Sequence, residues 1–407
     1  MNQDEKKIIF VAGGIYPYAS PTGGICLDIA REFNKKEKVK LVSSLTEYPV
    51  TTDTEFEGME LTVFYNSLYK MRFFFSQKES FLYKLGLNCV RVIDRLNTLL
   101  FVPKNGWWYW KKVYSELKKE LDAGRAKAII TFSEPFEAHW AARKLKEEGY
   151  QFNWIAFFAD SFAIPSNKRN LFISLDQMRA MEDEVLKTCD SFFVTPEIDE
   201  RCKDQYAAYA EKKNVFPYMI KNLVQPAVRS DSSINLVYAG RFYSDIRNPE
   251  KMLQTIVAAK VPGLHFDLYT KGDCESIVRK YQDENPDMIH LRDMVQRDQL
   301  NDIYANADIL VNMENKSHEF KPSKQYEYIS TGKPILSFYY FEPDAILAKY
   351  PYALQIQLTS NLASNQNDVK NFIISCKGKF VDYEEIKHIY PSNSLEHVVN
   401  EVRNLLS

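Results

Sequence analysis

The sequence predicts an α/β protein built from two doubly wound, Rossmann-like domains. Short apolar runs alternate with stretches in which apolar residues recur every three or four positions, and this alternation is typical of a parallel sheet covered by helices. The alternation starts again in the second half of the 407 residues. Because single cores stop growing at roughly 250–300 residues, a chain of this length favours two domains.

Each half of the chain contains six predicted strands. Those of the first half are residues 8–12, 39–43, 61–65, 128–132, 154–158 and 192–195. Those of the second half are residues 234–239, 265–270, 288–291, 308–312, 335–338 and 354–358. Helical spacing of apolar residues is clearest at 136–148 and 175–187, between strands of the first half.

The junction between the domains is predicted within residues 214–233, which contain Pro217 and Pro226 and end in a polar run. The predicted domains are therefore residues 1–215 and 216–407. The last residues, 393–407, are predicted to form one amphipathic helix, which can return to the first domain.

Composition and charge narrow the class of protein. The formal net charge of -2 gives no support for a nucleic-acid partner. Six cysteines are scattered without a C-x-x-C pair, so a reducing, cytoplasmic location fits better than a disulfide framework or a zinc site. The apolar run near the N-terminus is too short for a signal peptide, and no segment approaches the roughly 18–20 apolar residues that span a bilayer.

One candidate ligand-binding segment follows the predicted strand 308–312. It reads EFKPSKQYEYISTGKPIL and begins at Glu319. Pro322 suits the first position of a helix, which puts Ser323 and Lys324 in its first turn. A helix N-terminus offers unpaired N–H groups and a partial positive charge to a diphosphate. Glu327 lies on the same predicted helix face, where its carboxylate can accept hydrogen bonds from a ribose diol.

A second candidate segment, VYAGRFYSDIRNPEKML, follows the predicted strand 234–239. Gly240 allows a turn, Arg241 emerges at the carboxyl end of the strand, and Arg247 lies on the loop before a predicted helix start at 248–250. Guanidinium groups pair bidentately with phosphate oxygens, so two arginines at a strand end suit a pyrophosphate. In open α/β sheets, ligands bind at this carboxyl edge.

These two segments, in this order, resemble the retaining GT-B glycosyltransferases of family 4. That family has a Gly-Arg turn with a second cation ahead of a helix start, followed about eighty residues later by two glutamates with seven residues between them. Glu319 and Glu327 have this spacing. Pro322-Ser323-Lys324 is similar to a variant found in capsule and O-antigen enzymes. The segment around Val295 is similar to the family's base-facing turn, and Gly272 stands at its phosphate-side glycine.

The first half of the chain resembles the family more loosely. Residues 13–24, which include Gly14 and Gly24, resemble the family's first loop, which lies over the sugar and the acceptor. The alternative is that these glycines only shape a turn. Asp160 follows a predicted strand, in a loop similar to one of the family's, where it can orient the acceptor hydroxyl or act as a base. The alternative for Asp160 is a residue that caps a helix.

The resemblance implies a GT-B fold, with two domains facing a cleft, and transfer of a sugar from a nucleoside diphosphate with retention at the anomeric carbon. The first domain then binds a glycan or lipid-linked acceptor, and the second binds the donor. Arg241, Arg247 and Lys324 then stabilise the charge that grows on the leaving diphosphate. Glu319 contacts the sugar hydroxyls or is one more solvated charge.

No cofactor is implied beyond the nucleotide-sugar donor, and no metal is expected, since the sequence has no Asp-x-Asp pair. Two alternative functions stay open on the same architecture. One is a subunit that binds a nucleotide sugar without catalysis, and the other is a nucleotide-sugar 2-epimerase. An NAD-dependent dehydrogenase is disfavoured because no G-x-G-x-x-G follows a predicted strand.

Residues 66–118 interrupt the alternation and are rich in aromatic and basic side chains. One interpretation is an amphipathic segment in peripheral contact with an anionic membrane or a lipid-linked substrate, at the inner face of the cell membrane. The other is a helical insertion whose aromatic residues belong to the core and whose lysines are solvated.

Overall fold

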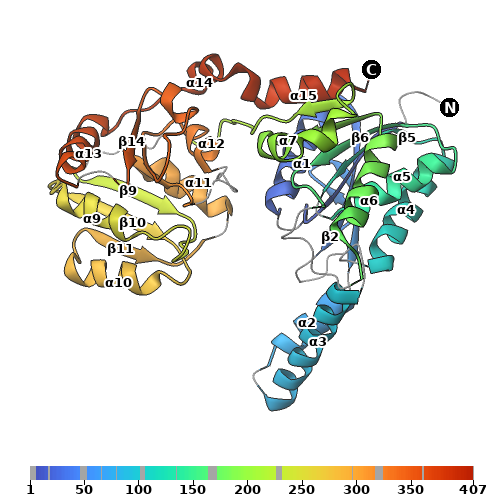
Figure 1. Cartoon of the computed structure of the whole chain (residues 1–407), viewed down its shortest axis with the longest axis horizontal. Coiled ribbons are helices and arrows are strands. Elements are labelled where there is room, and N and C mark those ends of the chain that lie inside the picture. The colour runs from blue at the N-terminus through green and yellow to red at the C-terminus, as the bar shows by residue number, and fades with distance from the viewer. Residues whose placement is uncertain are drawn as a thin grey trace. The chain divides into compact units, whose positions relative to one another are not determined.

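The computed structural model describes residues 6–16, 19–45, 53–65, 67–78, 80–100, 106–133, 135–163, 172–225, 232–295, 297–316, 324–359 and 362–406. The chain divides into two compact units. The first unit is Met1–Pro217 together with Val398–Ser407, and the second is Tyr218–His397. Figure 1 shows that each unit is a sheet flanked by helices.

The sheet of the first unit has the strand order β3-β4-β2-β1-β5-β6-β7-β8. All neighbouring strands are parallel except β3 and β4. The strands are β1 (Lys7–Gly13), β2 (Lys38–Leu45), β3 (Glu55–Phe56), β4 (Met59–Tyr65), β5 (Ala126–Phe132), β6 (Asn153–Phe158), β7 (Ser191–Val194) and β8 (Lys213–Val215).

Helices connect these strands. They are α1 (Pro21–Asn34), α2 (Ser67–Ser76), α3 (Phe81–Leu100), α4 (Gly106–Asp122), α5 (Glu137–Glu147), α6 (Leu175–Thr188), α7 (Pro196–Arg201) and α8 (Lys203–Ala207). Residues that favour helix starts are found where the helices begin. Ser174 and Gln177 form a reciprocal capping box at α6, for example.

The sheet of the second unit is parallel throughout, with the order β11-β10-β9-β12-β13-β14. Its strands are β9 (Ile234–Ala239), β10 (Leu264–Tyr269), β11 (Ile289–Arg292), β12 (Ile309–Met313), β13 (Ile335–Tyr339) and β14 (Ala353–Gln357). In chain order within the unit this is 3-2-1-4-5-6, the order of dinucleotide-binding folds.

The helices of the second unit lie between these strands and after the last. They are α9 (Glu250–Ala258), α10 (Glu275–Glu284), α11 (Arg297–Asn306), α12 (Lys324–Ile329), α13 (Leu362–Cys376), α14 (Tyr383–Ile389) and α15 (Leu395–Asn404), of which the last spans the division between the units.

Strand β9 shows how helices cover both faces of this sheet. Leu236 and Tyr238 pack in one hydrophobic cluster with residues of α9, α10 and α13. Val237 and Ala239 pack in another, with residues of α11, α12 and α14. Successive side chains of a strand point to opposite faces, so a strand buried on both sides must be apolar throughout. This is why the predicted strands read as continuous apolar runs.

The structure confirms the predicted fold class and corrects some elements. All twelve predicted strands are present, each within two residues of its predicted bounds. The short strands β3 and β8 were missed, because two or three residues carry too little pattern. The predicted amphipathic helix at 393–407 is present as α15, which begins two residues later than predicted because a 3₁₀ turn at Pro391–Asn393 precedes it.

The C-terminal helix packs on the first unit, as the sequence allows. The Arg403 guanidinium donates to the Glu32 carbonyl oxygen at 2.7 Å and lies over the Phe33 ring, 4.7 Å from its centroid. Asn153 donates to the Leu406 carbonyl oxygen at 3.2 Å. These contacts tie the end of the chain to α1 and β6.

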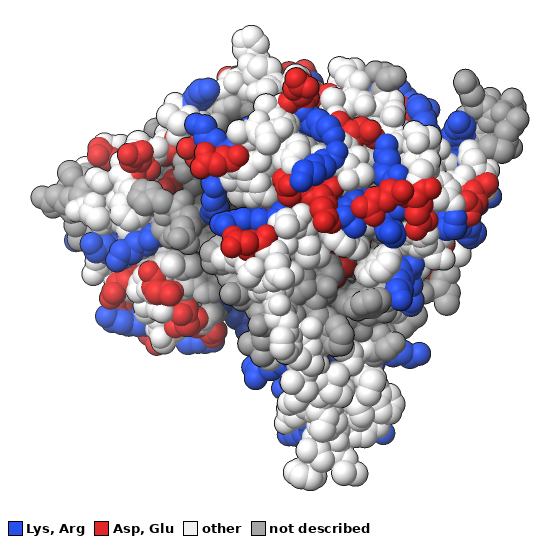
Figure 2. All heavy atoms as spheres, turned by 45° about the vertical axis from the view of Figure 1, so that its right-hand side comes forward, with Lys and Arg blue, Asp and Glu red and all other residues white. Residues whose placement is uncertain are grey.

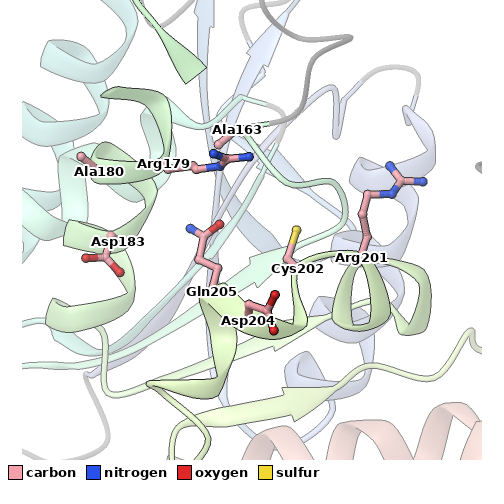
Figure 3. Close-up of a pocket in the computed structure, with 8 residues that line it drawn as sticks. All are labelled: Ala163, Arg179, Ala180, Asp183, Arg201, Cys202, Asp204 and Gln205. Atoms are coloured by element: carbon pink, nitrogen blue, oxygen red, sulfur yellow. The ribbon is translucent and has the colours of Figure 1, made fainter. Parts of the chain in front are cut away.

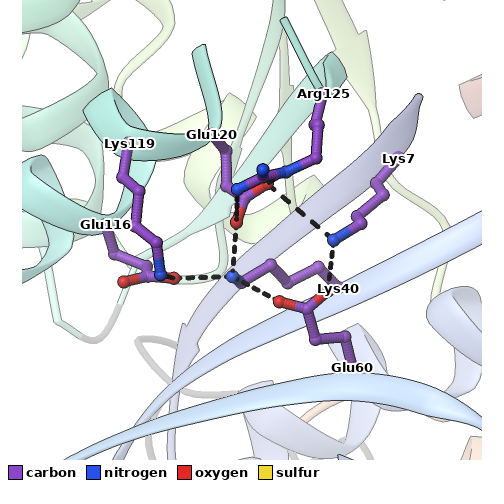
Figure 4. Close-up of polar contacts among 7 residues, drawn as sticks. All are labelled: Lys7, Lys40, Glu60, Glu116, Lys119, Glu120 and Arg125. Atoms are coloured by element: carbon purple, nitrogen blue, oxygen red, sulfur yellow. Dashed lines mark hydrogen bonds and ion pairs between the residues drawn. The ribbon is translucent and has the colours of Figure 1, made fainter. Parts of the chain in front are cut away.

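A buried ion network stabilises the edge of the first sheet where the strands begin (Figure 4). Lys40 of β2 is 1% exposed and donates to carboxylates of Glu60, Glu116 and Glu120 at 2.6, 2.6 and 2.8 Å. Arg125 donates to Glu120 at 2.8 Å. Burial alone would raise the pKa of Glu120, but the bonds from Arg125 and Lys40 outweigh it and lower the pKa to about 2.

Within the part of the chain that the structure describes, no helix has the length and apolar character needed to cross a membrane.

Candidate functional site

The second sheet has a topological switch point between β9 and β12. From β9 the chain proceeds outward to β10 and β11, and it then returns to β12 on the other side of β9. The connections that leave these two strands at their carboxyl ends therefore run in opposite directions, and open α/β sheets bind ligands in the crevice between them. Both candidate segments lie here, since Arg241 and Arg247 follow β9 and Lys324 and Glu327 follow β12.

Contacts made by Tyr238 hold the loop after β9 in place. The Tyr238 hydroxyl donates to the Arg241 carbonyl oxygen at 3.3 Å, and its ring stacks on that of Phe242 at 4.3 Å between centroids. The Arg241 side chain is exposed. Among the described residues it has no hydrogen-bond or ion-pair partner, so the guanidinium stands at the carboxyl edge with its donors directed to no described protein group.

Arg247 links the two loops at the switch point. Its Nε donates to Asn315 Oδ1 at 2.9 Å, two residues beyond the end of β12. Beside this bond, the backbone N–H of Lys316 donates to the Ile246 carbonyl oxygen at 2.6 Å. Burial raises the pKa of the Tyr238 hydroxyl to about 12, although the charge of Arg247 and a hydrogen bond from it act to lower that pKa. The Arg247 guanidinium therefore lies between the ends of β9 and β12.

Helix α12 holds a second cluster at the same sheet edge. Glu327 accepts hydrogen bonds from the Tyr304 hydroxyl at 2.9 Å and from Lys324 Nζ at 3.0 Å. The Lys324 ammonium also lies 5.7 Å from the centroid of the Tyr304 ring and 5.5 Å from that of Tyr328. The side chains of Lys324 and Glu327 are 26% and 28% exposed, so solvent or a ligand reaches both.

Tyr328 connects this cluster to β9. Its side chain is fully buried, and its hydroxyl accepts a hydrogen bond from the backbone N–H of Ala239, the last residue of β9, at 3.4 Å. The ring packs edge-on against Tyr304 at 5.6 Å. The helix that carries Lys324 and Glu327 is thus anchored to the strand that carries Arg241, and the two candidate segments share one edge.

Gly272 lets the loop after β10 approach the loop after β9. Its φ is +149°, and a Cβ there would lie 2.4 Å from the Phe242 carbonyl oxygen. Ser244 continues this contact with a hydrogen bond from its hydroxyl to Asp273 at 2.8 Å. Val295 lies partly buried in the loop after β11, one strand further out at the same edge.

Two predicted site residues, Glu319 and Ser323, lie outside the described residues, as does Pro322. The helix end that follows is described. Gly332 has φ +71° and ends the segment after α12. Lys333 is buried and donates to the carbonyl oxygens of Ala305 and Ala307, both at 2.7 Å, so it caps the end of α11.

In the first unit, Gly14 and Gly24 lie where β1 meets α1. Gly14 has φ +57°, and its carbonyl oxygen accepts a hydrogen bond from the backbone N–H of Ser20 at 2.7 Å. A Cβ on Gly23 would lie 2.0 Å from the same oxygen. Gly24 is buried in the first turn of α1. A turn and close backbone packing account for these glycines, and contact with a sugar stays a prediction.

Asp160 lies in the loop after β6, beside the end of β5. The Ser133 hydroxyl, which follows β5, accepts hydrogen bonds from the backbone N–H groups of Ala159 at 2.8 Å and Asp160 at 3.5 Å. Although the Asp160 side chain reaches solvent, the surrounding protein raises the pKa of its carboxyl, and Arg201 opposes this shift. A raised pKa suits a group that exchanges protons.

A pocket of about 510 Å³ is lined by Ala163, which also follows β6, and by residues of α6, α7 and α8 (Figure 3). Next to lining residues along the chain, the fully buried Glu182 accepts hydrogen bonds from Ser161 at 3.0 Å and from Tyr206 at 3.1 Å. The lining includes two arginines and two aspartates among its eight residues. The lining residues are Ala163, Arg179, Ala180, Asp183, Arg201, Cys202, Asp204 and Gln205.

Sequence analysis missed the residues that organise the donor-side site. Asn315, Tyr304 and Tyr328 hold Arg247, Glu327 and α12 in position. Asn315 is just beyond the predicted strand 308–312, and Tyr328 adjoins Glu327. Their nearness along the chain to predicted site residues was the signal by which they could have been found. No group of three or more His, Cys, Asp or Glu side chains suited to a metal ion occurs among the described residues.

The two units, each with a Rossmann-like sheet, define the GT-B fold. A search of protein-family models and of curated protein sequences finds no match for this chain.

Solved structures match it over almost its whole length. Sucrose-phosphate synthase from Thermosynechococcus elongatus matches with a TM-score of 0.57 and 12% identity, over 98% of each chain. HepE from Anabaena, solved with UDP and glucose, matches with a TM-score of 0.56 and 12% identity, over 98% of this chain and 99% of its own. The lipopolysaccharide outer core galactosyltransferase WaaB matches with a TM-score of 0.51 and 14% identity, over 98% and 99%. At these identities, the likeness is one of fold.

Proposed function

We propose that this protein is a glycosyltransferase that moves a sugar from a nucleoside diphosphate sugar to a glycan or lipid-linked acceptor. Transfer retains the configuration at the anomeric carbon and requires no metal ion. The observation that carries the proposal is the set of three cationic side chains, Arg241, Arg247 and Lys324, on the two segments that flank the switch point of the second sheet.

In the proposed reaction, these cations stabilise the charge of the leaving diphosphate. As the bond between the anomeric carbon and the diphosphate breaks, negative charge grows on the leaving diphosphate and positive charge on the sugar ring. Fixed cations near the diphosphate stabilise the transition state more than the ground state. Arg247 is held by Asn315 and Lys324 by Glu327, so the side chains need little reorganisation when the donor binds.

The remaining donor contacts follow from the family resemblance. Glu327 accepts hydrogen bonds from the ribose diol, Ser323 donates to the diphosphate, and Glu319 contacts sugar hydroxyls. Gly272 lets the backbone approach the phosphates, and Val295 faces the base. In the first unit, Gly14 and Gly24 lie near the sugar, and Asp160 orients the acceptor hydroxyl or takes up its proton.

Two further observations support the proposal. The fold is that of sugar-transferring enzymes, and HepE, one of the similar structures, was solved with UDP and glucose. All six cysteines are unpaired, which supports a reducing, cytoplasmic location.

The test starts with thermal stabilisation by a panel of nucleotide sugars. We expect one nucleotide to raise the melting temperature of the purified protein, because a ligand that binds only the folded state stabilises it. With that donor and candidate acceptors, NMR of the product is expected to show the anomeric configuration of the donor. A chelator is expected to leave the rate unchanged.

Other outcomes separate the alternative functions. Donor binding without transfer or donor hydrolysis would favour a non-catalytic binding subunit. Conversion of the donor into its C2 epimer would identify a 2-epimerase. Stabilisation by none of the nucleotide sugars would contradict all three functions.

A further inference from the structure

Helices α2 and α3 form a hairpin that extends away from the first sheet (Figure 1). It leaves the sheet at the carboxyl end of β4, since Tyr65 ends the strand and Ser67 begins α2. This edge of the sheet also carries the loops with Gly14 and Asp160. The hairpin corresponds to the first part of the aromatic, basic segment 66–118.

The two helices of the hairpin pack on each other through a specific contact. A Cβ on Gly86 would lie 2.5 Å from the Phe75 ring, so only glycine lets that ring sit against α3. The rings of Phe74 and Phe75 pack on Tyr83 at 5.6 and 6.0 Å between centroids. Val90 is 2% exposed. The inner face of the hairpin is therefore filled by the packing of α2 against α3. This packing does not account for the apolar residues of the outer face.

The outer face is apolar and exposed. On α3, Leu85, Cys89, Val92 and Leu96 follow the i+4, i+3, i+4 spacing of one helix face. Phe81 and Leu82, at the turn of the hairpin, are 78% and 73% exposed. The other exposed apolar side chains of the hairpin are Met71, Phe73, Phe74, Ile93 and Leu100. The interpretation that the aromatic residues of 66–118 belong to a core therefore fails for the exposed Phe73, Phe74 and Phe81. It holds for Tyr109 of α4, which is fully buried.

Cations border this apolar face. Lys84, Arg91 and Arg95 lie along one side of α3, at spacings of seven and four residues, and all are exposed. On α2 and the turn, Lys70, Arg72 and Lys78 add three more. Residues 67–100 contain these six cations against two acids, Glu79 and Asp94. Figure 2 shows the hairpin as a mostly uncharged projection with blue atoms at its margins.

The charge distribution indicates which partner covers the face. A second copy of the chain would bring two cationic stripes together around the apolar seam, and like charges would repel. An anionic bilayer offers both a hydrocarbon boundary for the apolar side chains and phosphates for the cations. An apolar helix face flanked by Lys and Arg is the pattern of helices that lie in the plane of such an interface.

We propose that the α2–α3 hairpin is a membrane-docking element, which buries Phe81, Leu82 and the outer face of α3 in the interface of an anionic phospholipid bilayer. Lys84, Arg91 and Arg95 then contact the lipid phosphates. Docking is independent of the transferase proposal. Its consequence, that a lipid-linked acceptor reaches the sheet edge from which the hairpin leaves, rests on that proposed function.

The test is sedimentation with vesicles of phosphatidylcholine alone and of phosphatidylcholine with phosphatidylglycerol. We expect binding to the anionic vesicles only, with weakening at high salt. A variant with Phe81→Ser, Leu82→Ser and Leu85→Ser is expected to bind at least about tenfold more weakly, since binding scales with buried apolar area. A variant with Lys84→Gln, Arg91→Gln and Arg95→Gln is expected to lose about a hundredfold, at about 1 kcal/mol per cation near the surface.

Matched controls and a local probe sharpen the result. Ile374 and Phe341 are 52% and 47% exposed in the second unit, so changing each to Ser removes exposed apolar area elsewhere and is expected to leave binding intact. A polarity-sensitive dye on Cys89, in a Cys202→Ser background, is expected to shift to shorter wavelength on anionic vesicles. Cys89 is exposed, Cys202 is partly buried, and the other four cysteines are buried.

Three results would overturn the proposal. One is equal binding of wild type and both hairpin variants, and another is no binding to anionic vesicles. The third is a dimer in sedimentation velocity that the Phe81, Leu82 and Leu85 variant abolishes, which would assign the face to a second copy. Thermal stabilisation by the nucleotide-sugar donor, measured on the same variants, is expected to be unchanged. A failure of docking is thereby distinguished from a failure of the transferase proposal.

Discussion

Lys324→Met is expected to lower kcat for sugar transfer by about 10²–10³-fold while changing donor affinity less. Methionine is an unbranched side chain of similar length, and it removes the charge that lies near the rings of Tyr304 and Tyr328. A fixed donor aimed at charge that develops in the transition state is worth that much in comparable sites. The measurement is steady-state kinetics with the identified donor, which separates kcat from KM.

The control for this variant is Lys387→Met. Lys387 is also a lysine of a helix in the second unit, paired to Glu384 at 2.7 Å and lying near the Tyr383 ring. Its replacement is expected to leave kcat unchanged within about threefold. Lys324→Arg keeps the charge and is expected to retain more activity than Lys324→Met. Equal kcat values for Lys324→Met and wild type would remove Lys324 from the proposed reaction.

Lys40→Met is expected to destabilise the first unit by about 3–5 kcal/mol, because removal of one partner from a buried ion network leaves uncompensated charge. Lys40 is 1% exposed and is the shared partner of Glu60, Glu116 and Glu120. Urea unfolding followed by tryptophan fluorescence measures this, and all five tryptophans belong to the first unit. The fluorescence transition therefore reports on that unit even if the two units unfold separately.

Lys38→Met provides the matched control, since Lys38 is an exposed residue of the same strand. Its effect is expected to be within about 0.5 kcal/mol. Because the pKa of Glu120 is lowered to about 2, its contribution is present above its ordinary pKa near 4.5 and is lost as the pH falls towards 2. Equal midpoints for Lys40→Met and Lys38→Met would show that the network contributes nothing to stability.

The strands and the two site loops could be predicted from the sequence because buried parallel strands have a distinct apolar pattern. Strands of a parallel sheet covered on both faces must be apolar along their whole length, so β9 and β12 are visible as runs of apolar residues. The carboxyl ends of such strands are where ligands bind. Arg241 and Glu327 could therefore be selected by their distance from a strand end.

Contacts between distant segments were not predictable in the same way. Arg247 and Asn315 are 68 residues apart, and their hydrogen bond exists only because β9 and β12 are neighbours in the sheet. Tyr304 and Glu327 meet because α11 and α12 pack on the same face. A pattern of apolar residues identifies these elements but does not specify which polar side chains pair between them.

The α2–α3 hairpin illustrates a different limit. Apolar residues at helical spacing occur both in helices that pack on a core and in helices that face a membrane, so the two interpretations of residues 66–118 could not be separated. The exposure of Phe81 and Leu82, beside the buried Val90 and the Phe75–Gly86 contact, separates the inner face from the outer face. The outer face is the one that stays exposed.

The central claim is that the segments after β9 and β12 form one diphosphate-binding site, and calorimetric titration with the nucleoside diphosphate of the identified donor tests it most directly. Arg241→Ala and Glu327→Ala are each expected to weaken binding at least tenfold, or about 1.4 kcal/mol, without unfolding the chain. The control Arg279→Ala, which removes an exposed arginine paired to Glu275 within α10, is expected to bind as wild type. Wild-type affinity in either Arg241→Ala or Glu327→Ala would contradict the shared site.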